Sequence, residues 1–257
     1  MDPRKLLPRG PGDLLWQILL FCGAYWVYRL VRGQVFDQSA AAFEHARQIV
    51  DAERALHLFV EPSLQSWAIQ TRWLDDVGAW MYINTHFVVT TCTLAFIYLF
   101  RNEHFYWVRN MFMVAMGLAL VGYVVYPTAP PRMLPELGFT DSVSDFTGVS
   151  SDASVNALFN PYAAVPSMHV GFALMLALPM IRMARRGWVK ALWAVYAPVV
   201  TLVVVVTANH WVLDAVAGAA VAAVSALAAQ TVFARVRPKA WAWAPEGEGL
   251  PAPARAG

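Results

Sequence analysis

Two short segments, NPYAAVPSMHVGFALML and TANHWVLDAVAG, each place a histidine at the start of a predicted apolar helix. His210 and Asp214 are four residues apart, so they project from one helical face, where the carboxylate can accept the Nδ1 proton of the imidazole. This pairing fixes the tautomer and leaves Nε2 available as a nucleophile. His169 supplies a second imidazole in the first turn of the other helix. The pattern therefore predicts nucleophilic chemistry assisted by a second histidine.

The surroundings of these histidines favour an anionic group as the substrate. Ser167 follows a proline and fits the N-cap of its helix, which would leave backbone N–H groups and the positive end of the helix dipole beside His169. Asn209 is predicted to cap the other helix in the same way, so that two helix N-termini face one place. Arg132, in YPTAPPRM, adds a planar guanidinium that suits phosphate oxygens. We expect these residues to form a phosphate cradle.

Each residue taken alone has a plainer interpretation. A single histidine or arginine at a membrane interface is more often a polar anchor, and His210 with Asp214 could simply form a structural pair. An ionisable residue such as Asp214 within an apolar span is, however, expensive and is functional by default. The gathering of two His, an Asp, a Ser and an Arg at one face of the protein favours a site.

The composition predicts the scaffold that must position these residues. The chain has 257 residues, of which 58% are hydrophobic and 14% charged, a balance typical of an integral membrane protein. Runs of about 18 or more apolar residues cross roughly 30 Å of hydrocarbon. Six candidates are Leu14 to Val31, Val77 to Phe100, Val108 to Tyr126, the shorter Ser167 to Ile181, Trp188 to Ala208, and His210 to Phe233. The predicted fold is all-α, a polytopic membrane protein with six transmembrane helices.

Basic residues predict the orientation of these spans. They group in four segments: Arg4, Lys5 and Arg9; Arg101 and Arg109; Arg182, Arg185, Arg186 and Lys190; and Arg235, Arg237 and Lys239. The positive-inside rule makes all four cytoplasmic and places segments 32–76 and 127–166 outside. Arg29 and Arg32, at the outer end of the first span, run against this rule. We expect a cytoplasmic N-terminus over 1–13, a six-span catalytic domain over 14–236 in a bacterial plasma membrane, and a disordered cytoplasmic tail over 237–257.

The segment between the first two spans is too polar to cross a bilayer. Phe43, Ala46 and Val50 recur at helical spacing, which predicts an amphipathic helix lying in the outer interface. Glu53 and Glu61 in this segment are expected to lie on its solvated face.

A second polar group falls within the second predicted span. Tyr82, Asn84 and His86 lie there, and Tyr162 precedes the fourth span. These residues are either interhelical packing or the wall of a substrate cavity, and the sequence leaves both open. No cluster of side chains has metal-ligand spacing, so we expect no metal and no cofactor.

The motifs resemble a known family. PSMH followed by NHWVLDAVAG resembles the signatures Pro-Ser-x-His and His-x-x-x-Asp of the phosphatidic acid phosphatase type 2 superfamily, and YPTAPPR with YINTH and YAAVPSMH is similar to its inositol phosphorylceramide synthase-like branch. The resemblance covers roughly residues 40 to 220. It implies a six-span core in which His210 attacks phosphorus, Asp214 orients it, and His169 protonates the departing oxygen.

The sequence departs from the phosphatase pattern at two cationic positions. A lysine expected seven residues before the first-motif arginine is Val125, and a Ser-Arg pair expected before the third-motif histidine is replaced within VVVVTAN. A less positive cradle favours a phosphodiester with one negative charge over a monoester or pyrophosphate with about two or more. Head-group transfer is therefore slightly favoured over simple dephosphorylation.

The predicted function is transfer of a phosphoryl or phosphoryl head group from a lipid phosphate ester in the outer leaflet, through a phosphohistidine. The partners expected are the bilayer, the lipid phosphate and an alcohol or polyol acceptor, with no nucleic acid. One alternative is a phosphatase for lipid phosphates or polyprenyl pyrophosphates. Another is a lipid transporter or scramblase, although the chain lacks the repeat symmetry typical of transporters.

Overall fold

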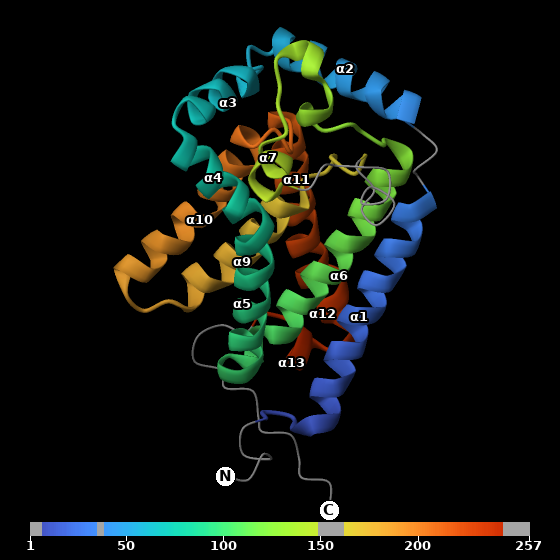
Figure 1. Cartoon of the computed structure of the whole chain (residues 1–257). Helices are drawn as coiled ribbons and strands as arrows, with labels where there is room; N and C mark the ends of the chain where they lie inside the picture. The colour runs from blue at the N-terminus through green and yellow to red at the C-terminus, as the bar shows by residue number, and fades with distance from the viewer. Residues whose placement is uncertain (1–6, 35–38, 149–161, 244–257) are drawn as a thin grey trace, which may run out of the picture.

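The computed structural model describes residues 7–34, 39–148 and 162–243 (Figure 1). Within these ranges the chain is helical and contains no strand, and an isolated parallel bridge pairs Thr128 with Ala163. The prediction of an all-α fold is therefore confirmed for the described residues.

Long helices form the body of the molecule. They are α1 (Gly10–Gln34), α6 (Asn102–Val125), α9 (Met168–Met183), α10 (Gly187–Val206) and α11 (Val212–Ala228). Two further runs are composite: α4 (Arg72–Trp80), η2 (Met81–Thr85) and α5 (His86–Phe100) are continuous, and η5 (Ala229–Phe233) and α12 (Ala234–Val236) prolong α11.

Four of these helical runs are long and apolar enough to cross a membrane: Arg72–Phe100, Asn102–Val125, Gly187–Val206 and Val212–Val236. They correspond to the second, third, fifth and sixth predicted spans, and they make the chain an integral membrane protein. The other two predicted spans are also helical, since α1 packs along α6 and α9 is a shorter apolar helix between α10 and α11.

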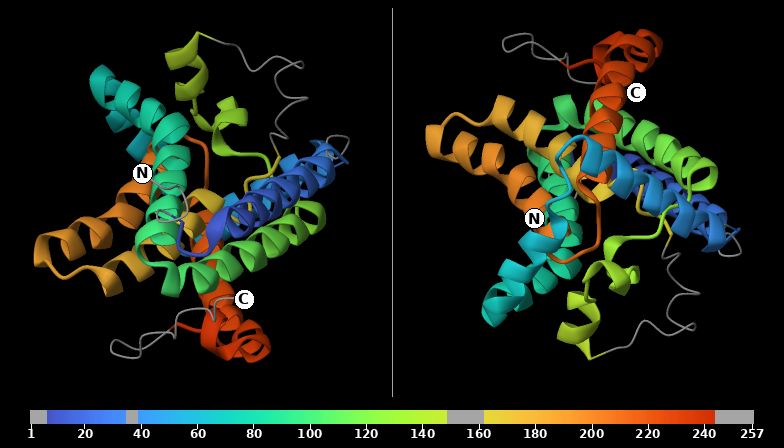
Figure 2. Two further views of the ribbon diagram at one scale, coloured as in Figure 1. Left: turned by 90° about the horizontal axis from the view of Figure 1, so that it is seen from below. Right: turned by 90° about the horizontal axis from the view of Figure 1, so that it is seen from above.

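A cap of short elements covers one end of the bundle (Figures 1 and 2). The cap consists of α2 (Ser39–Ala55), α3 (Glu61–Gln70), η3 (Pro131–Met133), η4 (Pro135–Leu137) and α7 (Ser142–Thr147). The predicted amphipathic helix is α2, which buries Ala42, Ala46, Ile49 and Val50 on one face and contacts α11. Its partners are thus protein elements of the cap and of α11.

Trp211 joins the cap to the bundle. Its side chain is fully buried, with ring contacts to Phe59 at 6.4 Å and Phe139 at 5.6 Å between centroids. Its Nε1 donates a hydrogen bond of 3.0 Å to the carbonyl of Ala129. The start of α11 is therefore packed against both parts of the cap, which come from distant segments of the chain.

Basic residues from the four predicted cytoplasmic segments contact aromatic rings at the opposite end of the bundle. The guanidinium of Arg9 lies 4.4 Å from the ring centroid of Tyr106, and that of Arg182 lies 5.5 Å from Trp243. Those of Arg109 and Arg237 lie 4.9 and 5.5 Å from the ring of Trp241. Cation–π contacts of this kind stabilise a charge against an aromatic face. The convergence agrees with the grouping of these segments by the positive-inside rule.

The C-terminal tail differs from the expectation of disorder from residue 237. Residues Pro238–Trp241 form α13, and the ring of Trp243 stacks on His104 at a centroid distance of 3.9 Å. The aromatic WAW segment is ordered because its rings find basic and aromatic partners on the bundle. The rest of the expected tail lies outside the described residues.

Candidate active site

His210 and Asp214 form the pair that their spacing predicts. His210 lies in the short connection between α10 and α11, just before the N-cap residue Trp211, and Asp214 lies in the first turn of α11. The Nδ1 atom of His210 is 3.3 Å from Asp214 Oδ2 and 3.0 Å from the carbonyl oxygen of Ala164. Since a carbonyl can only accept, Nδ1 carries the hydrogen and donates it, which leaves a lone pair on Nε2.

His169 lies beside this pair. It is in the first turn of α9, and its ring centroid is 5.6 Å from that of His210. Its other ring neighbours are Tyr82, stacked at 4.6 Å, and His86 at 4.5 Å. The structure thus brings the two histidines of the separate sequence motifs into one site.

Close packing of two helix starts sets this arrangement. The backbone N–H of Ser167 donates to the carbonyl of Asp214 at 3.0 Å, so the beginnings of α9 and α11 are in direct contact. A Cβ atom at Gly218 would collide with the carbonyl of Ser167, and one at Gly171 would lie 3.2 Å from the carbonyl of Gly218. Glycine is therefore required at position 218 for the two histidines to approach.

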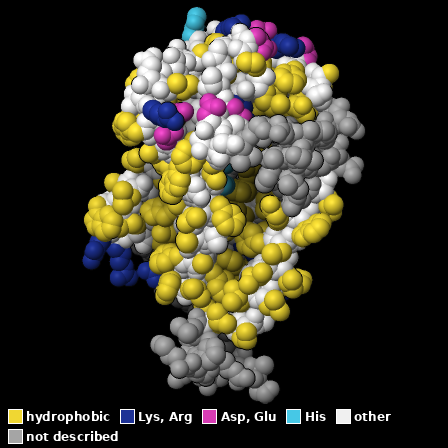
Figure 3. Space-filling view, viewed as in Figure 1, with side chains coloured by type: hydrophobic (Ala, Val, Ile, Leu, Met, Phe, Trp, Pro, Cys, Tyr) yellow, Lys and Arg dark blue, Asp and Glu magenta, His cyan; other side chains and the backbone are white. Residues whose placement is uncertain are grey.

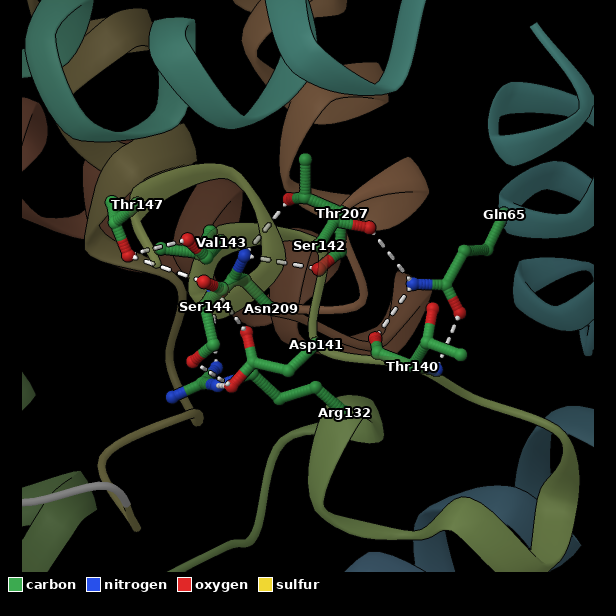
Figure 4. A network of polar contacts seen from close by, with 10 residues as sticks. All are labelled: Gln65, Arg132, Thr140, Asp141, Ser142, Val143, Ser144, Thr147, Thr207 and Asn209. Carbon is green, nitrogen blue, oxygen red and sulfur yellow. Dashed lines mark hydrogen bonds and ion pairs between the residues drawn. The ribbon is translucent and has the colours of Figure 1, made fainter. Parts of the chain in front are cut away.

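Arg132 is held in a polar network of the cap (Figure 4). Its Nη1 donates to Asn209 Oδ1 at 2.6 Å, and its Nε lies 3.6 Å from Asp141 Oδ2. Asn209 in turn donates to the hydroxyl and carbonyl of Thr207, at the end of α10. The guanidinium is therefore fixed next to the residue that precedes His210, and it is partly neutralised by Asp141.

Asp141 and its neighbours are tied to α3. The Oδ1 of Asp141 accepts from the backbone N–H of Ser144, and Gln65 donates to the carbonyl of Thr140 and to the hydroxyl of Ser142 (Figure 4). Gln65 and Ser142 are buried, so this end of the network is sheltered from solvent, whereas Arg132 and Asp141 are partly exposed. Neither Asp141 nor Gln65 was identified from the sequence, because no spacing indicates that Asp141 contacts Arg132 or that Gln65 contacts the segment around Asp141.

Asn209 does not cap α11. The N-cap residue is Trp211, and the backbone amides of the first turn bind three carboxyl groups. Asp214 accepts from Trp211 at 2.9 Å, Glu61 from Val212 at 2.9 Å, and Glu53 from Leu213 at 2.8 Å. This helix end is occupied and offers those amides to no phosphate.

The prediction that Glu53 and Glu61 lie on a solvated face is wrong, because both are fully buried. Charged residues on one face of a helix predict exposure to solvent only when no other element packs against that face. Here α11 covers the two carboxyl groups and supplies backbone donors to them.

Ser167 is the N-cap residue of α9 by position, but its hydroxyl makes no capping hydrogen bond. Its Oγ atom is buried and has no hydrogen-bond partner among the described residues. A buried hydroxyl without a partner costs free energy, which a phosphate oxygen accepting from it would recover. The start of α9 is thus the helix end of the site that side chains leave uncapped.

A small hollow adjoins His169. It is lined by Met81, Tyr82, Thr85, His86, His169, Val200, Val203 and Val204. The lining is mostly apolar, and the Nδ1 atom of His86 is buried without a partner in the part of the chain that is described. Three of the lining residues belong to η2, which is a π-helical turn, a distortion that is frequent at functional sites.

The two other residues expected at the cavity lie elsewhere. Asn84 donates to the carbonyl of Trp80 on its own helix. Tyr162 belongs to the buried cluster of the cap, where its ring meets Phe43 at 6.2 Å. Neither lines the hollow beside His169.

The site therefore combines a histidine with an oriented lone pair, a second imidazole, a fixed guanidinium and an uncapped helix start. Such a set can attack an electrophilic centre that carries negative oxygens, and it can move a proton to or from a neighbouring oxygen. The fixed positive groups can stabilise charge that develops on those oxygens.

Comparison with known proteins agrees with this chemistry. No curated protein and no solved structure matches the chain. A family model described as the PAP2 superfamily matches residues 47–228, a range that contains every residue of the site. The match covers more than half of the chain, so this chain belongs to the PAP2 superfamily, and its membership indicates an activity of the lipid phosphatase or phosphotransferase type.

Proposed function

We propose that the protein transfers a phosphoryl head group from a lipid phosphodiester to an alcohol or polyol, through a phosphohistidine on His210. The observation that carries this proposal is that Nδ1 of His210 donates toward two acceptors, Asp214 Oδ2 and the carbonyl of Ala164, which leaves Nε2 nucleophilic beside a second imidazole. Membership of the superfamily supports the lipid phosphate chemistry. The resemblance of the motifs to the inositol phosphorylceramide synthase-like branch supports head-group transfer as the reaction.

In the first step, Nε2 of His210 forms a bond to phosphorus and the bond to the lipid alcohol oxygen breaks. An alkoxide is a poor leaving group, so His169 gives a proton to that oxygen and the lipid leaves as a neutral alcohol. The charge that builds on His210 is stabilised by Asp214, which also holds the ring in place. Arg132 and the start of α9 bind the phosphoryl oxygens.

In the second step, the acceptor hydroxyl attacks the phosphohistidine. His169, now neutral, takes the hydroxyl proton while the new P–O bond forms and the bond from phosphorus to Nε2 breaks. Both histidines return to their starting states, so the reaction needs no net proton donor. Water in place of the alcohol would make the same site a phosphatase.

The charge of the site favours a diester as donor. Among the described residues, Arg132 is the cation of the cradle, and it is partly neutralised by Asp141. The N-terminus of α11, which was expected to attract phosphate, is occupied by Glu53 and Glu61. One negative charge on the substrate matches this environment better than two.

The proposed orientation places α1 and α9 with the four longer helices as a six-span bundle in a plasma membrane. The cap and the site then face the outside, and the basic cluster at the other end faces the cytoplasm. In Figure 3, hydrophobic side chains cover the helices below the charged cap, and a histidine side chain is visible in a recess between the two. In this orientation the recess lies at the level where lipid head groups of the outer leaflet would meet the protein.

The test is a product assay with the purified protein in lipid nanodiscs. Phosphatidylinositol, phosphatidic acid and a polyprenyl pyrophosphate are each supplied with and without an alcohol acceptor, and products are read by mass spectrometry. We expect a new phosphodiester from phosphatidylinositol that requires both acceptor and His210. Release of free phosphate from phosphatidic acid or from the polyprenyl pyrophosphate would contradict head-group transfer and identify the protein as a phosphatase.

The matched variants are His210→Ala and His57→Asn. His57 is an exposed cap residue with a positive φ of 57°, which asparagine tolerates, so its replacement should leave all rates intact. Equal activity of His210→Ala and wild type would exclude the phosphohistidine. Absence of product from every substrate would favour a lipid transporter.

A further inference from the structure

We propose that Glu53 and Glu61 form a carboxylic acid–carboxylate pair that positions His210 by clamping the first turn of α11 to the cap. The proposal rests on the proposed role of His210 as nucleophile. It assigns a task to two residues outside all three sequence motifs.

The clamp consists of consecutive backbone contacts. Glu61, at the start of α3, accepts from the N–H of Val212, and Glu53, on α2, accepts from the N–H of Leu213. Asp214 accepts from Trp211 in the same turn. Two of these three acceptors come from the cap, so the turn that orients His210 is held from outside its own helix.

The pair shares a proton. The second oxygen, Oε2, of each glutamate is buried and accepts no hydrogen bond from an N–H or hydroxyl group of the described residues, so the other glutamate is left as its partner. No described lysine or arginine forms an ion pair with either residue. Two ionised carboxylates buried together without a cation would repel strongly, and a proton between them removes that repulsion.

The titration of Glu53 agrees with this geometry. Burial and the hydrogen bond with Glu61 raise the pKa of Glu53 from 4.5 to about 9, against the opposing effect of the Leu213 N–H. The titratable groups that act on it from neighbouring elements are Glu61 on α3 and Asp214 on α11. At neutral pH Glu53 therefore holds the proton and donates it to Glu61.

This pKa has a definite sign for stability. Between pH 4.5 and about 9 the folded protein binds a proton at Glu53 that the unfolded chain has lost. The contribution of Glu53 to stability is thus largest at low pH and decreases as pH rises toward about 9. Ionisation near pH 9 would add a charge beside Glu61 and Asp214 and loosen the turn.

The experiment compares two variants at position 53 with one control variant, Glu44→Gln, and with His210→Ala. Glu53→Gln keeps an acceptor for Leu213 and supplies an N–H donor to Glu61, so it imitates the protonated acid and cannot ionise. Glu53→Ala removes the clamp. Glu44→Gln is the control, because Glu44 is an exposed residue of the same helix. The fourth protein, His210→Ala, reports whether the chemistry itself depends on the histidine.

We expect Glu53→Ala to lower kcat by about tenfold or more with little change in KM, because a positioning residue acts on the reacting geometry. Glu53→Gln should recover most of that loss and should lack the decline in kcat that wild type shows near pH 9. Its thermal unfolding temperature should also vary less with pH between 5 and 9. Glu44→Gln should follow wild type in every measurement.

Two outcomes overturn the inference. One is a wild-type kcat in Glu53→Ala, and the other is a pH–rate profile of Glu53→Gln that superimposes on wild type, each with His210→Ala inactive. Activity retained by His210→Ala would instead refute the proposed function. The pH dependence of unfolding would still test the shared proton in that case.

Discussion

Replacing Gly218 by alanine tests whether contact between α9 and α11 sets the distance between the two histidines. A Cβ at this position would collide with the carbonyl of Ser167, which is backbone and cannot rotate away. The start of α9 must then retreat by about 1 Å, and a displacement of reacting groups by about 1 Å costs on the order of 100-fold in rate. His169 is two residues beyond Ser167, so its ring moves with this helix end.

The stability cost of the same change should be moderate. Overpacking a close helix contact typically destabilises a protein by about 1–3 kcal/mol. Gly117→Ala on α6 is the matched control, since a Cβ there meets nothing within 4 Å. We expect that control to leave kcat intact and to stabilise its helix by about 0.5–1 kcal/mol, because alanine is the better helix former.

The assay measures kcat and KM of both variants together with thermal unfolding in the same nanodiscs. We expect kcat of Gly218→Ala to fall by about 100-fold while the protein remains folded, so that its loss of stability does not account for the loss of turnover. A Gly218→Ala protein with the kcat of wild type would refute the argument that this contact positions His169. A fall in kcat of equal size in Gly117→Ala would show that helical alanines in general disturb the protein.

Three further changes address the polar groups of the site. Asp214→Asn keeps an acceptor for the N–H of Trp211 but disturbs the tautomer of His210, so we expect a folded protein whose kcat is lower by about 10³–10⁴. Arg132→Lys keeps the positive charge but lacks the planar guanidinium, which can bind Asn209 and phosphate oxygens at the same time. KM, measured from initial rates over a range of substrate concentrations, should therefore rise about tenfold. His86→Phe retains the stacking on Phe172, at a centroid distance of 5.5 Å, and removes a buried nitrogen without a partner. Its unfolding temperature should hold or rise while kcat falls, and an unchanged kcat would make His86 a packing residue.

Local features of the sequence predicted the helices and the contact between His210 and Asp214 correctly. A run of apolar residues long enough to cross a bilayer is a property of the segment itself, and so is the four-residue spacing that pairs His210 with Asp214. The start of α9 at Ser167 follows from the same local rules, since an N-cap residue and the helix behind it are neighbours in the chain. These predictions did not depend on how the helices pack.

The sequence could not decide which long-range partners the polar residues take. Glu53 and Glu61 read as solvent-facing charges because their own helices are polar there, and only the packing of α2 and α3 on α11 buries them. Asn209 looked like a helix cap, but Arg132, distant in the chain, takes its side-chain oxygen. In both cases a contact with another element replaced the role that the local sequence predicts, which was solvent exposure for the glutamates and helix capping for Asn209.

The same distinction separates the motifs from the site. Sequence alone determined which residues could attack a phosphate, because residue type and helical spacing are local. Tertiary structure alone decided that one helix end is open and the other filled by carboxyl groups, and that Gly218 lets the two histidines approach within 5.6 Å. The physical reason is that hydrogen-bond partners and van der Waals contacts between helices depend on their relative placement, which no single segment encodes.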